Sequence, residues 1–424
     1  MAIPMTRSPE HLLLLVSTTG YTGNAFRDAA ARLGVSVIVG SDRCHVLADQ
    51  WSEDGMLTLD FRDPEAAVEQ IVIAAAARKI RAILPSSELT ATIAARASAR
   101  LGLPHNAPEG AAAAGNKALM RARLVAAGVR SPTARTFAIT EDPGAIAADV
   151  RYPCVLKPLL LSASRGVIRA DDAPSFVAAW RRIAALLALP ELLARDPTAG
   201  AKILVEPFVP GFEVAVEGLL SAGALRVLAI FDKPDPLDGP YFEETIYVTP
   251  SRLPAATQEV IAATTAAAAR ALGLREGPLH AELRINDEGA WVIEVAARSI
   301  GGLCGRALRF GVDMTLEELL IRHAMGLATI ADEREGAASG VMMIPIPRAG
   351  ILDHVGGVEA AKRVPGIDDV SVRSPGARVA PPPDGDAYLG FIFAHGASPA
   401  LVEGALREAH ALLDVQITPL LPST

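Results

Sequence analysis

Two glutamates on neighbouring stretches of the chain, Glu282 and Glu294, have the spacing of paired metal-binding residues. Residues 279–285 and 291–295 each alternate apolar and polar side chains, and the turn-forming residues 286–289 between them end in glycine. This pattern predicts a β-hairpin. A three-residue loop, 287–289, places Glu282 directly opposite Glu294, whereas a four-residue loop places it opposite Ile293.

Opposed carboxylates destabilise a sheet unless a positive charge lies between them, and Mg²⁺ suits that position because it binds carboxylates together with phosphate oxygens. A solvated hairpin face with two unrelated glutamates is the alternative. Arg298, Gly301 and Gly302 follow closely and favour the metal site. Arginine binds phosphate or carboxylate through two bonds, and glycine lets a ligand approach the backbone.

Residues 153–169 have the composition of a loop that folds over a triphosphate. An apolar strand at 154–156 leads to Lys157, and a loop of leucines and small residues runs through Arg165 and Gly166 to a second strand at 167–169. Lysine acts as a point charge, and small residues expose backbone N–H donors. An ordinary hairpin with two surface cations is the alternative.

The elements that must position these residues begin with strand–helix alternation over the first 101 residues, which predicts a parallel α/β layer. The loop at 18–23 lacks the third glycine of a dinucleotide site, and Asp42 is a weak ribose partner. A nicotinamide-dependent enzyme is therefore disfavoured. The loop reads as a strand-to-helix turn at the carboxyl edge of the sheet, where it could touch substrate.

Further helices and strands are predicted from the pattern of apolar residues and from helix-capping residues. Asn116 caps a helix at 117–127 with Lys117 in its first turn, and helices are predicted at 173–194, 255–272 and 398–413. Residues 195–200 form a polar break. Strands are predicted at 203–209, 211–217, 340–346 and 388–394, and loops at 232–245 and 381–383. Taken alone, Glu213 and Glu217 read as solvent-facing strand residues.

Composition excludes several classes of protein. The 424 residues, half of them hydrophobic, predict about three domains of ~150 residues each. A net charge of −8 without a basic block argues against nucleic-acid binding. Cys44, Cys154 and Cys304 match no disulfide or metal spacing, which suggests a reducing compartment. There is no signal peptide and no membrane-length apolar run, so a cytoplasmic protein is expected.

The chain resembles the ATP-grasp ligases, and most nearly the branch of the dipeptide-forming L-amino acid ligases and carnosine synthase. The resemblance has four ordered anchors: Lys117, the Lys157 loop, the crossing from Glu206 to Glu213, and Glu282 with Glu294 and Arg298. Glu294 begins an E-x-A-A-R-x-x-G-G motif, Asn116 begins N-K-x-x-M-R-x-x-L-x-x-A-G-V, Lys157 begins the K-P-x-x-x-[GS]-x-S-[KR]-G-V loop, and 232–245 resembles D-K-x-x-x-x-x-x-P-x-F-x-E-T. The resemblance implies metal binding by Glu282 and Glu294; nucleotide binding by Lys117, Lys157, Ser162, Ser164, Arg165, Gly166, Glu206, Phe208, Val209, Glu213 and Lys233; substrate binding by Glu244, Arg298, Gly301 and Gly302; and catalytic roles for Lys157 and Arg298.

The chain departs from the wider family at two places. Ala163 and the leucines at 159–161 stand where glycines often occur, and Ala296 replaces the usual third metal ligand, an asparagine. The second departure is shared by the dipeptide-ligase branch. A catalytically silent nucleotide-binding protein is the alternative that Ala296 leaves open.

The resemblance implies α/β and α+β architecture in four parts: a Rossmann-like domain that precedes the ATP-grasp region (1–115), a lid subdomain (116–205), a large subdomain with the metal hairpin (206–335) and a small α+β C-terminal subdomain (336–424). It implies ligation of amino acid-like carboxylate and amine substrates through an acyl phosphate, with ATP and Mg²⁺ or Mn²⁺, no nucleic acid or membrane partner, and compatibility with a homodimer. Residues 162–166 and 232–245 are then expected to be lids that close when ATP binds.

Overall fold

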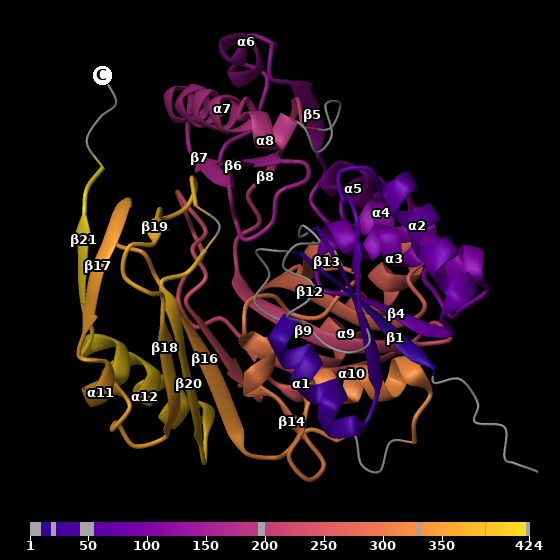
Figure 1. Cartoon of the computed structure of the whole chain (residues 1–424). Helices are drawn as coiled ribbons and strands as arrows, with labels where there is room; N and C mark the ends of the chain where they lie inside the picture. The colour runs from indigo at the N-terminus through magenta and orange to yellow at the C-terminus, as the bar shows by residue number, and fades with distance from the viewer. Residues whose placement is uncertain are drawn as a thin grey trace, which may run out of the picture.

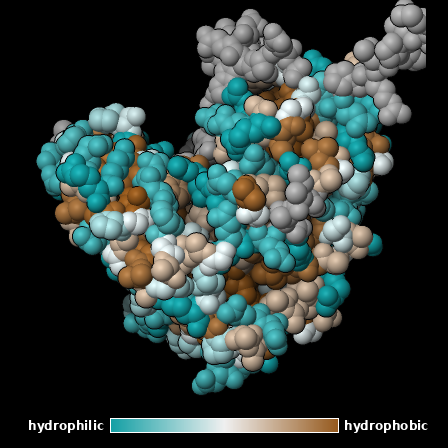
Figure 2. Space-filling view, turned by 90° about the horizontal axis from the view of Figure 1, so that it is seen from below, coloured by the Kyte–Doolittle hydropathy of each residue, from teal (hydrophilic) through white to brown (hydrophobic). Residues whose placement is uncertain are grey.

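The computed structural model describes residues 10–17, 23–42, 55–193, 200–328, 333–385 and 387–420. The expectations for the loop at 18–22, for Cys44, and for the polar break at 195–199 lie outside these residues. None of the described helices is long and apolar enough to cross a membrane. In the face shown in Figure 2, hydrophilic residues alternate with separate hydrophobic patches.

The first sheet is parallel throughout, which confirms the predicted α/β layer. Its strand order is β3-β2-β1-β4, with β1 (His11–Val16), β2 (Ser36–Ser41), β3 (Met56–Thr58) and β4 (Ile80–Pro85). Helix α1 (Gly23–Leu33) lies between β1 and β2, α2 (Pro64–Ala77) lies between β3 and β4, and α3 (Glu88–Leu101) follows β4. Leu12 to Leu15 of β1 are fully buried because both faces of a parallel sheet are covered.

A lid sheet with the order β5-β8-β6-β7 lies above the rest of the molecule in Figure 1. It comprises β5 (Arg135–Ala138), β6 (Cys154–Pro158), β7 (Ile168–Ala170) and β8 (Lys202–Pro207), with α6 (Pro143–Ala147), α7 (Ala173–Leu187) and α8 (Pro190–Leu193). The antiparallel β6–β7 pair confirms the hairpin predicted around Lys157. The helix predicted over 173–194 instead ends at Leu187, and Pro190, which lacks an N–H and cannot continue a helix, begins a separate turn.

An antiparallel sheet of eight strands forms the centre of the molecule, in the order β13-β12-β9-β10-β11-β16-β20-β18. The strands are β9 (Phe212–Ser221), β10 (Ala224–Asp232), β11 (Ile246–Thr249), β12 (Gly277–Asn286), β13 (Gly289–Ala296), β16 (Ala338–Ile344), β18 (Ile367–Val372) and β20 (Gly390–Gly396). β16, which follows residue 335, pairs with β11, which precedes it. The boundary predicted there between the large subdomain and the C-terminal subdomain therefore does not separate two sheets.

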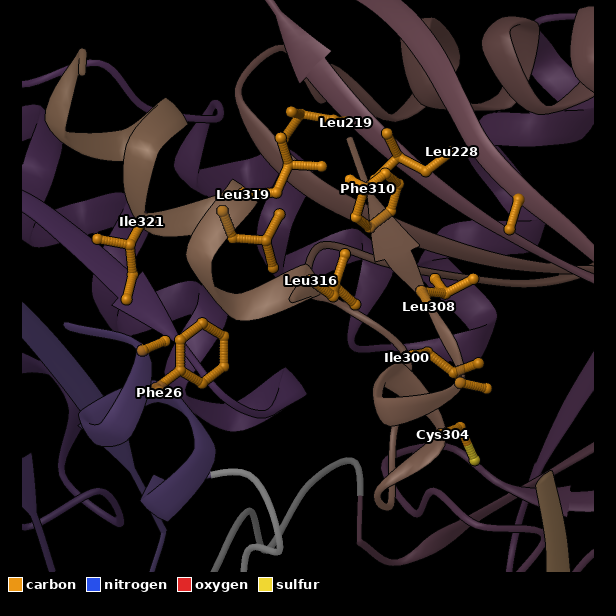
Figure 3. Packing of buried hydrophobic residues seen from close by; sticks show 14 of the residues in the cluster. Phe26, Leu219, Leu228, Ile300, Cys304, Leu308, Phe310, Leu316, Leu319 and Ile321 are labelled. Atoms are coloured by element: carbon orange, nitrogen blue, oxygen red, sulfur yellow. The ribbon is translucent and has the colours of Figure 1, made fainter. Parts of the chain in front are cut away.

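Helices cover both faces of this sheet. On one face, α9 (Ala255–Leu272) buries Ile261 and Leu272 against β9 and β12, and α4 (Pro108–Ala114) and α5 (Lys117–Ala126) join it. On the other face, α10 (Leu316–Met325) places Leu319 between Phe26 of α1 and the strands, as Figure 3 shows. These packed layers fix the central strands from which the polar residues of the site project.

The C-terminal region adds a small three-stranded sheet, β19-β17-β21, with β17 (Gly350–Gly356), β19 (Arg378–Val379) and β21 (Asp414–Thr418). Helices α11 (Val358–Ala361) and α12 (Pro399–Ala411) complete it, and Val402 and Leu406 of α12 pack on the extended central sheet. Two short strands, β14 (Arg309–Phe310) and β15 (Met314–Thr315), and the turn η2 (Cys304–Ala307) lie before α10.

Candidate active site

One cavity of about 260 Å³ gathers most of the residues singled out from the sequence. It lies where the lid loop (159–167), the flap loop (233–245), the carboxyl end of β4 and the β12–β13 hairpin meet. The predicted residues that line it are Lys117, Lys157, Ser162, Ser164, Glu206, Phe208, Val209, Glu213, Glu244, Glu282, Glu294, Arg298, Gly301 and Gly302. Arg165, Gly166 and Lys233 are not among its lining residues.

The hairpin pairs Glu282 directly with Glu294, although the turn differs from the expected three-residue loop. Asn286 pairs with Gly289, so the turn has two residues, and that register alone would put Glu282 opposite Ile293. A β-bulge at Ile293 inserts one residue and restores the pairing of the two glutamates. The carbonyl of Ile293 is bound instead by Nη2 of Arg121, at 2.7 Å.

The two paired carboxylates fit a divalent cation. Their side chains are about one-fifth and one-quarter exposed, so both offer oxygens to the cavity. Glu294 Oε2 lies 3.5 Å from Lys117 Nζ, and Glu282 Oε1 lies 3.3 Å from Lys233 Nζ. An all-oxygen set of one or two carboxylates open to a phosphate is what Mg²⁺ prefers.

Lys233 lies at the centre of a cluster of three glutamates. Its Nζ donates to Glu213 at 2.8 Å and to Glu244 at 2.5 Å, and oxygens of Glu213, Glu244 and Glu282 lie within 4.8 Å of one another. Burial alone would lower the pKa of Lys233, but these three carboxylates raise it well above its ordinary value. Lys233 therefore holds the flap loop to β9 and β12 as a fixed positive charge.

Glu213 and Glu217 are buried, so the interpretation of both as solvent-facing residues was wrong. The reason is the sheet: β9 lies between β10 and β12, and helices cover both faces. Burial raises the pKa of the Glu217 carboxyl despite His280 Nδ1 at 3.5 Å. Glu213 is bound by Lys233 and by Arg284, whose Nε lies 2.9 Å from it.

Glu206 forms a buried ionic cluster beneath the lid. Its oxygens accept from Nε of Arg121 at 2.8 Å and contact Lys157 Nζ at 2.6 Å. Burial would raise the pKa of this carboxyl, but Arg121 and Lys157 outweigh it and hold the pKa at about 2. The cluster fixes Lys157 with its ammonium beside the cavity.

This cluster gives a pH prediction. A carboxyl with a depressed pKa stabilises the fold above its ordinary pKa of 4.5, and the contribution is lost as pH falls toward about 2. We expect Glu206→Gln to be less stable than wild type near neutrality, and the difference between their free energies of unfolding to shrink as pH falls from ~5 to ~2. Urea unfolding across this range is the measurement, with the exposed Glu288→Gln as control; a constant difference would contradict the prediction.

The lid loop has a strained backbone. Ala163 and Ser164 both have φ of 54°, and Gly166 has φ of 72°. For non-glycine residues this conformation costs ~1–3 kcal/mol each and persists where the surroundings impose it. Leu159 and Leu161 are buried, as expected for a closed lid, and their carbonyls are bound by the backbone N–H and the Nζ of Lys117, at 3.2 and 2.7 Å.

A cation–aromatic stack borders the cavity near the β8–β9 crossing. The guanidinium carbons of Arg169 and Arg284 lie 4.2 and 4.8 Å from the centroid of the Phe208 ring. Arg284 also donates to the carbonyls of Val209, at 2.8 Å, and Leu237. The crossing and the flap loop are thus held by one buried arginine.

The lining residues that sequence reasoning missed include three charged or titratable ones next to the predicted site, Glu88, His280 and Arg284. Arg298, predicted to bind substrate, is paired with Glu88 through its Nε at 2.9 Å. Glu88 follows β4 at the carboxyl edge of a parallel sheet, a place where ligand-binding residues gather. His280 and Arg284 lie two residues before and two residues after Glu282 on β12, so all three side chains are on the same face of the strand. Alternation along the strand could therefore have identified both residues.

Comparison with known proteins agrees with this architecture. Residues 150–307 match the ATP-grasp domain, residues 27–105 match the ATP-grasp N-terminal domain, and residues 342–418 match the L-amino acid ligase C-terminal domain 2. The chain thus contains the N-terminal and central domains of ATP-grasp proteins, followed by a C-terminal domain of the L-amino acid ligase type. Its fold, expected from the sequence, is thereby confirmed.

Individual relatives vary in their reactions. Alanine–anticapsin ligase of Bacillus subtilis is 30% identical over 301 residues, which are 67% of this chain and 63% of that protein, less than two thirds of its length. Formate-dependent phosphoribosylglycinamide formyltransferase of Mycolicibacterium vanbaalenii is 24% identical over 85% of this chain and 87% of its own. The crystal structure of L-amino acid ligase from Bacillus licheniformis superposes with a TM-score of 0.79 at 25% identity, covering 97% of this chain and all of that one.

Proposed function

We propose that this protein is an ATP-dependent carboxylate–amine ligase that joins two amino acids or close analogues. The observation that carries the proposal is the single cavity in which Glu282 and Glu294 lie paired, together with Lys117, Lys157 and Arg298. The C-terminal match to L-amino acid ligases and the names of two relatives support amino acid substrates. The cytoplasm is the proposed compartment, because unmatched cysteines suit a reducing environment.

The proposed reaction has two steps. An oxygen of the substrate carboxylate attacks the γ-phosphorus of ATP, which forms an acyl phosphate and releases ADP. The amine nitrogen then attacks the acyl carbon, the C–O bond to phosphate breaks, and the nitrogen loses a proton to leave an amide and inorganic phosphate. In phosphoryl transfer of this kind the protein mainly positions the reactants and neutralises charge.

Different residues of the cavity are assigned to the phosphates, the base and the metal ion. Lys117 and Lys157 face the phosphates, and the exposed N–H groups of the lid loop around Ser162 and Ser164 add donors. Phe208 and Val209 border the base, and Glu282 and Glu294 would hold Mg²⁺. Bound there, the ion would neutralise phosphate charge and orient the transferred group.

Two further charged residues of the cavity are suited to the carboxylate and amine substrates. Arg298 is only 13% exposed, and the Glu88 carboxylate raises its pKa although burial alone would lower it, so it offers a fixed positive charge for a carboxylate or an acyl phosphate. Glu244 also lines the cavity, and it accepts hydrogen bonds from the hydroxyls of Tyr247 and Tyr388 at 2.6 and 3.3 Å as well as from Lys233. We assign this acidic group to the amine substrate.

Two alternatives are tested by one experiment. A silent nucleotide-binding protein would bind ATP without turnover, and a formate-using enzyme would follow the relation to the formyltransferase. We would measure phosphate release from ATP with Mg²⁺ across pairs of amino acids, with formate as a separate carboxylate, and identify products by mass spectrometry. Amide formation from an amino acid pair is expected; turnover with formate alone, or nucleotide binding without turnover, would overturn the proposal.

A further inference from the structure

Three segments from distant parts of the chain meet at one guanidinium, that of Arg182 on α7. Its Nε and Nη2 donate to the two carboxylate oxygens of Asp384 at 3.0 and 2.7 Å. Its Nη1 donates to the hydroxyl of Tyr241 in the flap loop at 2.8 Å, and its carbon lies 5.3 Å from the centroid of that ring. Lid, flap and C-terminal region are thus joined at a single side chain.

Asp384 belongs to a proline-rich turn, the latch loop (381–385), which also contacts the lid loop directly. The backbone N–H of Gly166 donates to the carbonyl of Pro383 at 2.8 Å, and Nε of Arg165 donates to the carbonyl of Asp384 at 3.0 Å. Between the lid, flap and latch loops the structure leaves about 10 Å³, roughly the space of one water molecule. Of the three residues expected to bind nucleotide that do not line the cavity, Lys233 binds the carboxylates of the site, whereas Arg165 and Gly166 contact the C-terminal region.

The latch loop has a rigid shape and the lid loop a strained one. Three prolines restrict the latch backbone, and a Cβ on Gly385 would lie 1.9 Å from the carbonyl oxygen of Ala380, so only glycine fits there. Ala163 and Ser164 both have positive φ, a conformation that persists only where surrounding contacts impose it. The two residues that follow them, Arg165 and Gly166, both donate to carbonyls of the latch loop.

We propose that the latch loop positions the lid loop over the phosphates of ATP, with Asp384 as a positioning residue and Arg182 as its partner. The proposal rests on the proposed function for the identity of the nucleotide. It assigns to the C-terminal region a part in ATP binding, although the latch loop itself does not line the cavity. A weakened latch admits water to the acyl phosphate, so more phosphate is released for each amide formed.

An ordinary surface ion pair is the competing explanation, because the side chains of Arg182 and Asp384 are about half exposed and such pairs contribute little to stability. Variants that reverse one charge of the Arg182–Asp384 pair distinguish the latch from an ordinary surface ion pair. Arg182→Asp and Asp384→Arg are each expected to raise the KM for ATP by roughly 3- to 10-fold and to raise the ratio of phosphate to amide, with the KM values of the amino acids little changed. The double variant Arg182→Asp/Asp384→Arg is expected to restore both values to within about 2-fold.

The pair Arg100–Glu69 is the matched control, with Nη1 and Oε2 2.6 Å apart, similar exposure, and a position on α3 and α2. Arg100→Asp and Glu69→Arg should leave the KM for ATP unchanged. An unchanged KM for ATP in the latch variants, or a double variant that restores only the melting temperature, would overturn the proposal.

Hydrogen exchange separates failure of the latch from failure of the proposed function. In the protein without nucleotide, peptides covering 159–167 should exchange faster in Asp384→Arg than in wild type, and protection should return in the double variant. Adding a non-hydrolysable ATP analogue with Mg²⁺ should protect the wild-type lid loop further. Unchanged exchange in the single variants overturns the latch even if ligation is found, whereas wild-type protein that fails to bind ATP overturns the proposed function alone.

Discussion

Replacing Glu294 with glutamine is expected to lower the rate of amide formation by about 100- to 1,000-fold while the fold stays intact, a loss comparable to removal of one charge-stabilising group from an active site. The substitution keeps the size of the side chain but removes the negative charge opposite Glu282. An amide is a poor ligand for Mg²⁺ in place of a carboxylate. Stability should change little, because the Glu294 side chain is one-quarter exposed and its contact with Lys117 is 3.5 Å long.

Glu288→Gln is the control for this variant. Glu288 lies in the turn of the same hairpin with its side chain about two-thirds exposed, and its contact with Arg130 is 3.8 Å long. The control should retain wild-type turnover. Initial rates would be measured against Mg²⁺ concentration, and circular dichroism would verify folding. Near-normal turnover of Glu294→Gln at saturating Mg²⁺ would exclude metal binding at this pair.

The sequence predicted those features well that depend on the pattern of residues within single helices and strands. Alternation predicted the hairpin, and the pairing of Glu282 with Glu294, one of the two registers left open, is found through a bulge rather than the expected loop; the helix at 255–272 is found with those bounds in α9. The parallel order of the first sheet also followed from its strand–helix repeat. In each case the deciding pattern is periodicity within single elements, or their order along the chain, so no contact between distant segments has to be known.

Features that depend on contacts between distant segments were not predicted. The hairpin turn was wrong because the bulge at Ile293 depends on Arg121, which lies 172 residues earlier in the chain. The burial of Glu213 and Glu217 depends on neighbouring strands that share no local pattern with β9. Likewise, the last 89 residues gave no sign that β16 would extend the central sheet rather than form a separate domain.

Replacing Lys157 with alanine is expected to weaken ATP binding by about 10- to 150-fold, the loss of one charge-assisted interaction of roughly 1.5–3 kcal/mol. Lys157 is buried at the end of β6 with its ammonium 2.6 Å from Glu206, and it lines the cavity. Glu206 keeps two hydrogen bonds from Arg121 in the variant, so the buried carboxylate stays neutralised and the lid sheet should fold.

Calorimetry with a non-hydrolysable ATP analogue and Mg²⁺ measures this effect, with Lys202→Ala as the control. Lys202 lies in the same sheet, at the exposed start of β8, so its loss removes an equal charge from the lid without reaching the cavity. The control should bind the nucleotide with wild-type affinity, and amino acid binding should change in neither variant. If Lys157→Ala bound the analogue as tightly as wild type, Lys157 would be a partner of Glu206 alone. The phosphate charge would then have to be neutralised by Lys117, the other lysine that lines the cavity.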